Sequence, residues 1–154
     1  MDEISEVRRL ADLDAIRQLK ARRIRAIDTK DWATYEAVHA PDHYSHNDGE
    51  PRWDGAKANT DRLALLFEGV QTIHHVHTAE IELTSPTMAT GIWAMEDYLY
   101  WKQGGEDHWL HGFGFYYETY EKREGQWLFT SRKLRRTRVM TSAGAALGQH
   151  DRPV

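Results

Sequence analysis

A chain of 154 residues without cysteine can form neither disulfides nor a thiolate metal site, and its length suits one domain with a single core. The formal net charge of -4 gives no general attraction for nucleic acid, and no apolar run approaches the ~20 residues that span a bilayer. We therefore expect neither nucleic-acid nor membrane partners. The charged start MDEISEVRRL lacks an apolar signal region, which makes the cytoplasm the default location.

The first seventy residues carry mostly helical patterns. Apolar residues recur every three or four positions between residues 3 and 28, which predicts a helix, and Asp12 could cap a second helix within that stretch. Asp31 is placed to act as the N-cap of a short helix that follows. The run DHYSHN then predicts a short strand, and a further helix is expected from about Ala56 to Phe67.

The second half has the pattern of a sheet. From Thr72 to Met140 the chain predicts four long strands, separated by TSPT, KQGGED and KREGQ, and the last two breaks are typical of hairpin loops. Helices followed by a meander predict an α+β fold. We expect a cone-shaped barrel, in which a curved, mixed and largely antiparallel sheet wraps around the helices. Residues 1–140 would form one domain, and the small, polar residues 141–154 a flexible tail.

One strand suggests where this fold could be hollow. In HWLHGFGFYYETYEK, alternation places Gly112 and Gly114 on one face. Two glycines there either clear space for a ligand or mark a bend or bulge that curves the sheet, and both readings remain open. The opposite face is aromatic and large enough to suggest a surface buried between subunits. Its aromatic residues, grouped with one from the last strand, are Trp109, Phe113, Phe115, Tyr117 and Trp127.

Three histidines stand close together in GVQTIHHVHTAEIEL. On a strand, His75 and His77 point the same way and could hold one metal ion, as in part of a cupin motif. The second cupin motif is missing, so this remains an alternative. His74 faces the other side, where a single imidazole could act as a base with Asp28, at the end of the first helix, as its orienting partner. From the residues alone, a solvated aspartate and a structural histidine are the more common alternatives.

Four stretches together resemble a known family. AIDTKDW, HAPDHYSHN, TIHHVHTAEIEL and YEKREGQWLF occur in the order and with the spacing of the SnoaL-like branch of the nuclear-transport-factor-2-like superfamily, over roughly residues 10–138. Within that branch, the sequence resembles scytalone dehydratase and lindane dehydrochlorinase. The resemblance implies a cone with one deep pocket and a catalytic pair formed by Asp28 and His74. His74 would take a proton from carbon, and Asp28 would hold the imidazole.

The sequence also departs from scytalone dehydratase. Ile27 and Asn47 stand where that enzyme has tyrosines, and Leu99 stands where it has a second catalytic histidine. Its serine and asparagine positions in the penultimate strand fall on Gly114 and Tyr116. We therefore do not expect scytalone as the substrate.

The leading hypothesis is a cofactor-independent lyase or isomerase that acts on a small, mostly apolar cyclic molecule. No phosphate loop or dinucleotide fingerprint occurs, so no cofactor is expected. A binding module without chemistry, and a metal enzyme that uses His75 and His77, are the alternatives. The resemblance favours a homotrimer, with a dimer also open. Arg23, Arg25 and Arg132 could bind a substrate anion. The residues expected to bind substrate are Tyr44, Asn47, Trp53, Trp93, Asp97, Leu99, Gly112, Gly114 and Tyr116.

Overall fold

The computed structural model describes residues 5–154, and this part of the chain contains three helices and six strands. The sequence predicted all three helices and the long strands, with boundaries that differ by a few residues. In chain order the elements are α1 (Glu6–Thr29), α2 (Trp32–Ala37), β1 (His39–Ser45), β2 (Trp53–Asp54), α3 (Ala56–Leu66), β3 (Gln71–Ser85), β4 (Met88–Gln103), β5 (Glu106–Arg123) and β6 (Gln126–Thr141).

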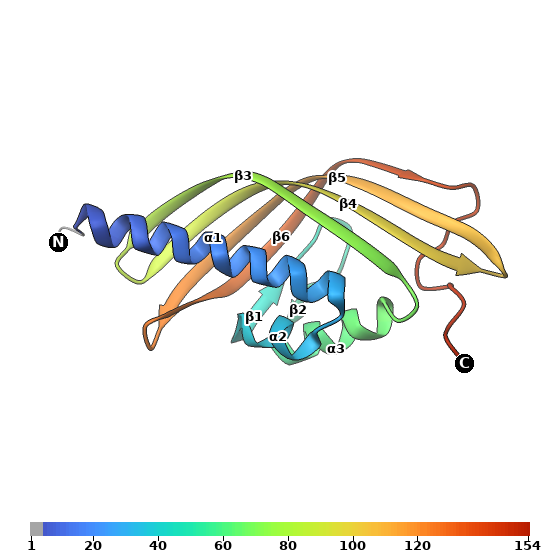
Figure 1. Cartoon of the computed structure of the whole chain (residues 1–154), viewed down its shortest axis with the longest axis horizontal. Coiled ribbons are helices and arrows are strands. Elements are labelled where there is room, and N and C mark those ends of the chain that lie inside the picture. The colour runs from blue at the N-terminus through green and yellow to red at the C-terminus, as the bar shows by residue number, and fades with distance from the viewer. Residues whose placement is uncertain (1–4) are drawn as a thin grey trace.

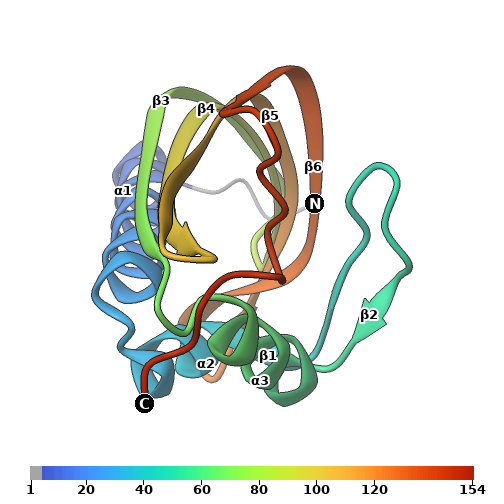
Figure 2. The same ribbon diagram turned by 90° about the vertical axis from the view of Figure 1, so that its right-hand side faces the viewer.

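The strands form one curved, mixed sheet in the order β2-β1-β6-β5-β4-β3. Neighbours are antiparallel except β1 and β6, which run parallel. The predicted α+β class and the largely antiparallel sheet are confirmed. In the part of the chain that the structure describes, the outermost strands do not pair with each other, so the barrel is open. Figure 1 shows α1 lying along the sheet, and Figure 2 shows β3 to β6 arching above α2 and α3.

The first helix is continuous, and the predicted break at Asp12 is wrong. The helix begins at Ser5, whose side chain accepts a hydrogen bond from the Arg8 backbone N–H. The Asp12 carboxylate instead accepts a hydrogen bond of 2.8 Å from the Trp127 indole and pairs with Lys122 at 2.7 Å. Trp127 is therefore buried and does not belong to the outer aromatic face. The predicted helical residues 3 and 4 lie outside the described residues.

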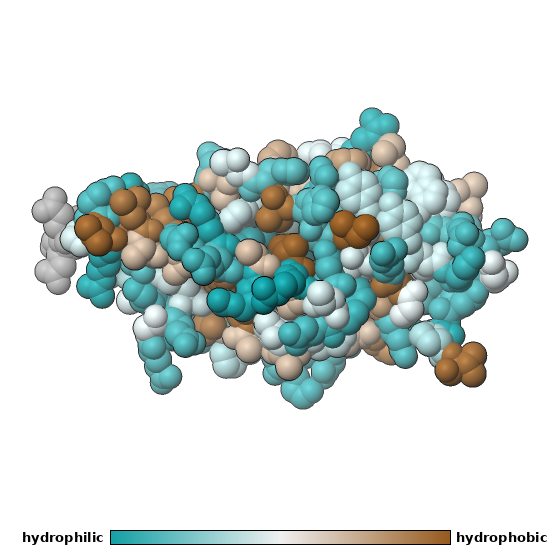
Figure 3. All heavy atoms as spheres, in the orientation of Figure 1, coloured by the Kyte–Doolittle hydropathy of each residue, from teal (hydrophilic) through white to brown (hydrophobic). Residues whose placement is uncertain are grey.

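The buried side of α1 is part apolar and part charged. Leu13, Ile16, Leu19 and Ile27 are buried as the helical spacing predicts, but Val7 and Leu10 are exposed. The charged side chains of Asp12, Lys20 and Arg23 are buried as well. In Figure 3, which looks onto α1, hydrophobic residues form small separate groups among hydrophilic ones, with one group at the N-terminal end of this helix. Within residues 5–154, no helix is both long and apolar enough to cross a membrane.

The C-terminal segment 142–154 runs back against the fold, across the end that lies near α3 (Figure 2). Its Asp151 carboxylate accepts hydrogen bonds of 2.8 and 2.9 Å from the backbone N–H groups of Gly104 and Gly105. His150 is buried and hydrogen-bonded to the backbone carbonyl of Glu68. These contacts tie the segment to the β4–β5 hairpin and to the residues that follow α3.

Candidate active site

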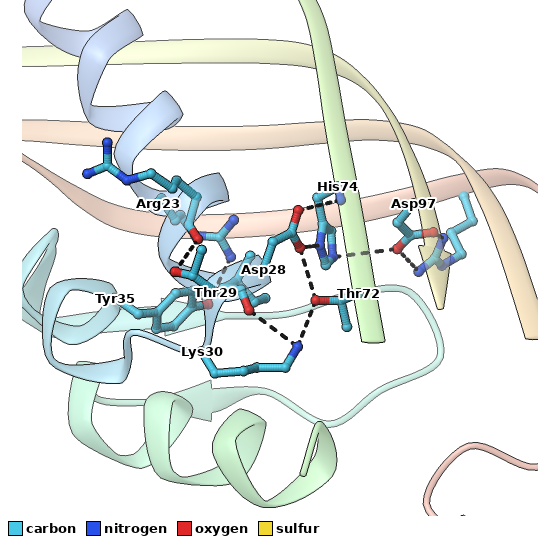
Figure 4. A network of polar contacts seen from close by, with 11 residues as sticks. Arg23, Asp28, Thr29, Lys30, Tyr35, Thr72, His74 and Asp97 are labelled. Atoms are coloured by element: carbon cyan, nitrogen blue, oxygen red, sulfur yellow. Dashed lines mark hydrogen bonds and ion pairs between the residues drawn. The ribbon is translucent and has the colours of Figure 1, made fainter. Parts of the chain in front are cut away.

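Asp28, in the last turn of α1, meets His74 of β3 inside the fold (Figure 4). Asp28 Oδ1 lies 2.7 Å from His74 Nδ1, and Asp28 Oδ2 accepts a 2.8 Å hydrogen bond from the His74 backbone N–H. The His74 side chain is only 6% exposed. A carboxylate at Nδ1 favours the neutral tautomer with its proton there, which leaves Nε2 free to accept a proton.

Two further side chains hold the aspartate in place. Thr72 Oγ1 donates a hydrogen bond of 2.9 Å to Asp28 Oδ1 and accepts one of 2.8 Å from Lys30 Nζ. Lys30 has a φ of 59° and caps the C-terminus of α1, so the same residue ends the helix and supports the site. Neither residue was predicted from the sequence. Thr72 could have been found, because it precedes His74 by two positions on a strand and so shares its face.

Hydrogen bonding keeps Asp28 ionised despite its partial burial. Burial raises the pKa of the Asp28 carboxyl, but the hydrogen bonds from the ring and backbone of His74 outweigh that effect and hold the pKa below its ordinary value. At neutral pH Asp28 is therefore a carboxylate. Such a carboxylate can offset the positive charge that the imidazole gains when it takes up a proton.

A cavity of about 210 Å³ opens beside the pair, and His74 lines it. His74 Nε2 lies 3.9 Å from Asp97 Oδ2 across this space. Much of the wall is apolar, and the polar groups come mainly from β4, β5, β6 and the loop after β1. A small, partly apolar cavity next to a free imidazole nitrogen suits a ring-sized ligand. The apolar wall includes Ile27, Leu63, Phe67, Leu99, Leu110 and Leu134.

Comparison with known proteins assigns the chain to a family. Residues 8–133, most of the chain, match the family model of the SnoaL-like domain. The chain belongs to the SnoaL-like family. The resemblance inferred from the four sequence stretches is thereby confirmed, and the curved sheet with N-terminal helices is also the fold of its structural neighbours.

Several proteins similar to this SnoaL-like chain carry the names of enzymes. It is 28% identical over 136 residues to the protein named Probable cyclase FGR4 from Gibberella zeae, a match that covers 79% of this chain and 88% of that protein. The hexachlorocyclohexane dehydrochlorinase LinA type 2 superposes with a TM-score of 0.81 at 20% identity, over 97% of this chain and 98% of that one. A candidate scytalone dehydratase from Novosphingobium aromaticivorans superposes with a TM-score of 0.76 at 22% identity, over 96% of this chain and 95% of that one. At such identities the structural likenesses establish the fold alone.

Four of the side chains predicted to bind substrate line the cavity of this SnoaL-like domain: Asn47, Asp97, Leu99 and Tyr116. Tyr116 is 1% exposed, and burial raises the pKa of its hydroxyl, so the group keeps its proton at neutral pH. The structure thus brings together the dyad, a second carboxylate and a phenol around one small space. Leu99 contributes only apolar surface, where scytalone dehydratase was inferred to have a histidine.

Three predicted residues lie elsewhere. Tyr44 stacks against the guanidinium of Arg52, 3.8 Å from the ring centroid. Trp53 lies under Arg62, whose guanidinium is 4.8 Å from the ring centroid, so Trp53 meets the cavity only through that arginine. Trp93 is buried and donates its indole N–H to a tyrosine hydroxyl in a separate part of the core. None of the three lines the cavity beside His74.

The arginines proposed for anion binding separate into three environments. Arg23 is fully buried and donates hydrogen bonds to Tyr35 at 2.9 Å and to His39 at 3.2 Å, away from the cavity lining. Arg25 is exposed on α1. Arg132 alone of the three lines the cavity.

Gly112 and Gly114 of β5 leave space that other atoms of the protein fill. A Cβ at Gly112 would lie 1.8 Å from Arg136 Nη1 and 2.3 Å from Asp97 Oδ1. Gly112 therefore admits the two-pronged Arg136–Asp97 ion pair, with hydrogen bonds of 2.9 and 2.8 Å. A Cβ at Gly114 would lie 2.1 Å from the backbone oxygen of Arg135, where the β5–β6 register shifts. The bulge interpretation fits Gly114, whereas Gly112 shapes the cavity wall indirectly.

These contacts predict different effects for two matched substitutions. Gly114→Ala should lower the free energy of unfolding by about 1–3 kcal/mol, because its new methyl group meets rigid backbone. Gly112→Ala should cost less stability, because the flexible end of Arg136 can shift, but the shift should distort its ion pair with Asp97 beside His74. Urea unfolding of both variants measures the difference. Equal losses of stability would contradict this interpretation.

The histidines proposed as metal ligands lie on the outer face of the sheet. The side chains of His75 and His77 are 59% and 57% exposed and lie 3.5 and 3.3 Å from the carboxylate of Glu96. They point away from His74, as strand alternation predicts. Among residues 5–154, no three His, Cys, Asp or Glu side chains converge in a way that could hold a metal ion. The donor geometry therefore does not favour the metal-enzyme alternative.

Proposed function

We propose that this SnoaL-like protein is a cofactor-independent lyase or isomerase that acts on a small, mostly apolar cyclic molecule. The observation that carries the proposal is the Asp28–His74 hydrogen bond beside a ring-sized cavity. An imidazole has its ordinary pKa of ~6.5 near neutral pH, so it can both take and return a proton under working conditions. The carboxylate at Nδ1 leaves Nε2 as the reacting nitrogen.

The chemical step is a proton transfer followed by loss of a leaving group. His74 Nε2 takes a proton from a carbon next to a carbonyl group, and Asp28 offsets the charge of the resulting imidazolium. The electron pair of the C–H bond moves to form a C=C bond as the bond to a neighbouring hydroxyl breaks. The imidazolium returns its proton to the departing hydroxyl, which leaves as water. Return of the proton to another carbon would give isomerisation.

Tyr116 is the proposed donor to the carbonyl oxygen of the substrate. Its hydroxyl belongs to a side chain that is 1% exposed and lines the same cavity as His74. A protonated phenol in a dry site can stabilise the negative charge that develops on that oxygen when the carbon loses its proton. The cyclase, dehydrochlorinase and dehydratase names of the relatives agree with proton abstraction from a ring.

The test follows proton abstraction directly and does not require knowledge of the physiological substrate. A panel of cyclic ketones, with and without a β-hydroxyl group, is incubated with the protein in D₂O. Proton NMR then measures loss of the α-proton signal, and ultraviolet absorbance measures formation of a conjugated enone. We expect exchange at the α-carbon of at least one ring, and elimination only where the hydroxyl is present.

A binding module without chemistry predicts another outcome. In that case the panel members would bind, as seen by thermal stabilisation, but no α-proton would exchange above the rate in buffer. That result would overturn the lyase or isomerase proposal and leave the ligand-binding function.

We also propose that the outer face of the sheet packs against another copy of the chain. Phe115 and Tyr117 are 39% and 40% exposed on this face, and burying such apolar surface is worth ~25 cal/mol per Å². A trimer is favoured by the family resemblance, and a dimer is the alternative. Sedimentation velocity should give a multiple of the 17.9 kDa chain mass, and Phe115→Glu should shift it toward the monomer. A monomeric wild-type protein would contradict this proposal.

A further inference from the structure

Arg132 is a buried cation whose hydrogen-bonding groups are left unused. It lies on β6, is 8% exposed and lines the cavity beside His74. Its Nε atom is buried without a hydrogen-bond partner, and its guanidinium forms no ion pair with any residue between 5 and 154. Arginine stays charged in proteins and has five N–H donors. A buried charge in this state is costly unless a ligand supplies the missing partner.

The neighbouring carboxylates are already engaged. Asp97, across the cavity, has each oxygen bound by one nitrogen of Arg136, at 2.9 and 2.8 Å. Glu118 has one oxygen on Lys20 Nζ and the other on the Tyr120 hydroxyl. Neither carboxylate is therefore available as the partner of Arg132 without breaking an existing contact.

The buried charges around Arg132 also indicate that an anionic partner is missing. Lys20, Arg23 and Arg132 are all buried, and Glu118 is the carboxylate that favours the charged form of each of them. The imidazole of His43 adds no charge, because burial and the nearby Arg132 and Arg23 lower its pKa to about 3. Arg23 and Arg132 both stay charged, and they share this one buried carboxylate with Lys20. The region carries a surplus of positive charge that an anionic ligand would neutralise.

A second arginine faces the same cavity. Arg62 of α3 lines it, and the Nε atom of this residue is also buried without a hydrogen-bond partner. The carboxylates of Asp48 and Glu50 border the cavity too, but both residues are exposed. Glu50 accepts a hydrogen bond from Asn47. Of the carboxylates that line the cavity, Asp97 is thus paired with Arg136, and Asp48 and Glu50 are exposed, while Arg132 and Arg62 each keep a buried Nε atom without a hydrogen-bond partner among residues 5–154.

We propose that the ligand of this cavity is a cyclic carboxylic acid, whose carboxylate binds Arg132, with Arg62 as a second contact, while its ring lies against the apolar wall. The planar guanidinium has two parallel N–H groups, which can donate hydrogen bonds to the two oxygens of a carboxylate. The reaction of the ring at His74 rests on the proposed function, whereas the binding of the carboxylate to Arg132 does not. The substrate thus has two separate parts: a carboxylate that anchors it and a ring carbon that reacts at His74.

Isothermal titration calorimetry of the wild-type protein tests the proposal without a known substrate. The probes are benzoate, 2-naphthoate and cyclohexanecarboxylate, each compared with its own carboxamide, which has nearly the same shape and no charge. We expect at least one acid to bind about tenfold more tightly than its amide, a difference of ~1.4 kcal/mol. If no acid binds better than its amide, the inference is wrong. It is equally wrong if formate or chloride binds as tightly as the best acid, because the site then serves a small anion.

Two variants assign the effect to one residue. Arg132→Met keeps an apolar stem and removes the charge, so it should abolish the preference for the acid over the amide. Arg25→Met removes a charge from exposed α1 surface and should leave that preference unchanged. Persistence of the preference in Arg132→Met would overturn the assignment, and the wild-type comparison stands even if this variant does not fold.

The outcome is independent of the dyad. His74→Ala should still bind the best acid, because the anchor and the base are different residues. Acid binding without α-proton exchange would support this inference and reject the lyase or isomerase proposal. Exchange of the α-proton without any preference for acids would support the lyase or isomerase proposal and reject this inference.

Discussion

His74→Ala is expected to reduce α-proton exchange and elimination by about 10³-fold while the protein remains folded. A positioned general base contributes typically 10² to 10⁴-fold to the rate, and no other imidazole lines the cavity in the part of the chain that the structure describes. The fold should survive, because Asp28 keeps its hydrogen bonds to Thr72 and to the backbone N–H at position 74. Exchange rates by NMR and thermal unfolding curves measure the two effects.

Asp28→Asn should have a smaller but still large effect, about 10²-fold on the same rates. The asparagine side chain can donate a hydrogen bond to Nδ1, which would favour the tautomer with its proton on Nε2, and it offers no negative charge to an imidazolium. His75→Ala is the matched control, because its side chain neighbours His74 in sequence but is 59% exposed on the opposite face. Full activity in either dyad variant would remove the dyad from the mechanism.

Strand alternation alone predicts which histidine faces inward. His74 and Thr72 share one face of β3, and His75 and His77 share the other, because successive side chains of a strand point to opposite sides. The partner of His74 could not be predicted in this way. Which carboxylate reaches it depends on where the end of α1 docks on the sheet, and that is a tertiary property. The pairing with Asp28 was inferred from the family resemblance.

Helical periodicity was a poorer guide to α1. It correctly selects Leu13, Ile16 and Leu19 as core residues, and the same spacing places Lys20 and Arg23 on that buried face. What it does not predict is that a charged side chain can be buried there, because that depends on partners from other elements. Lys20 meets Glu118 of β5, and Arg23 meets Tyr35 of α2.

The glycine spacing in β5 predicted where side chains are missing from the sheet, but not what occupies the space. The sequence shows that Gly112 and Gly114 remove two side chains from one inner face. It does not show that Arg136 arrives from the next strand to fill the first space, because that depends on register, which shifts between β5 and β6 at this point. Shape complementarity between strands is not visible from one strand alone.

Glu118→Gln is expected to lower the free energy of unfolding by about 3–5 kcal/mol, because it removes one partner of a buried ion pair. Lys20 and Glu118 both have fully buried side chains, and Lys20 Nζ pairs with Glu118 Oε1. The Tyr120 hydroxyl donates a hydrogen bond of 2.6 Å to Glu118 Oε2. Burial lowers the pKa of Lys20 from its ordinary 10.5 to about 7, and the Glu118 carboxylate opposes that shift. Urea unfolding at pH 6 and at pH 8 measures the loss.

The pH dependence of this loss has a definite sign. Without Glu118 the pKa of Lys20 in the folded state falls further, while in the unfolded state it stays near ~10.4. Between those values the unfolded state binds more protons, so the stability of the variant rises with pH and its loss should be larger at pH 6 than at pH 8. The double variant Lys20→Met with Glu118→Leu should recover most of the stability, because it buries no charge. A loss below about 1 kcal/mol in Glu118→Gln, or one that grows with pH, would show that the ion pair does not support the fold in this way.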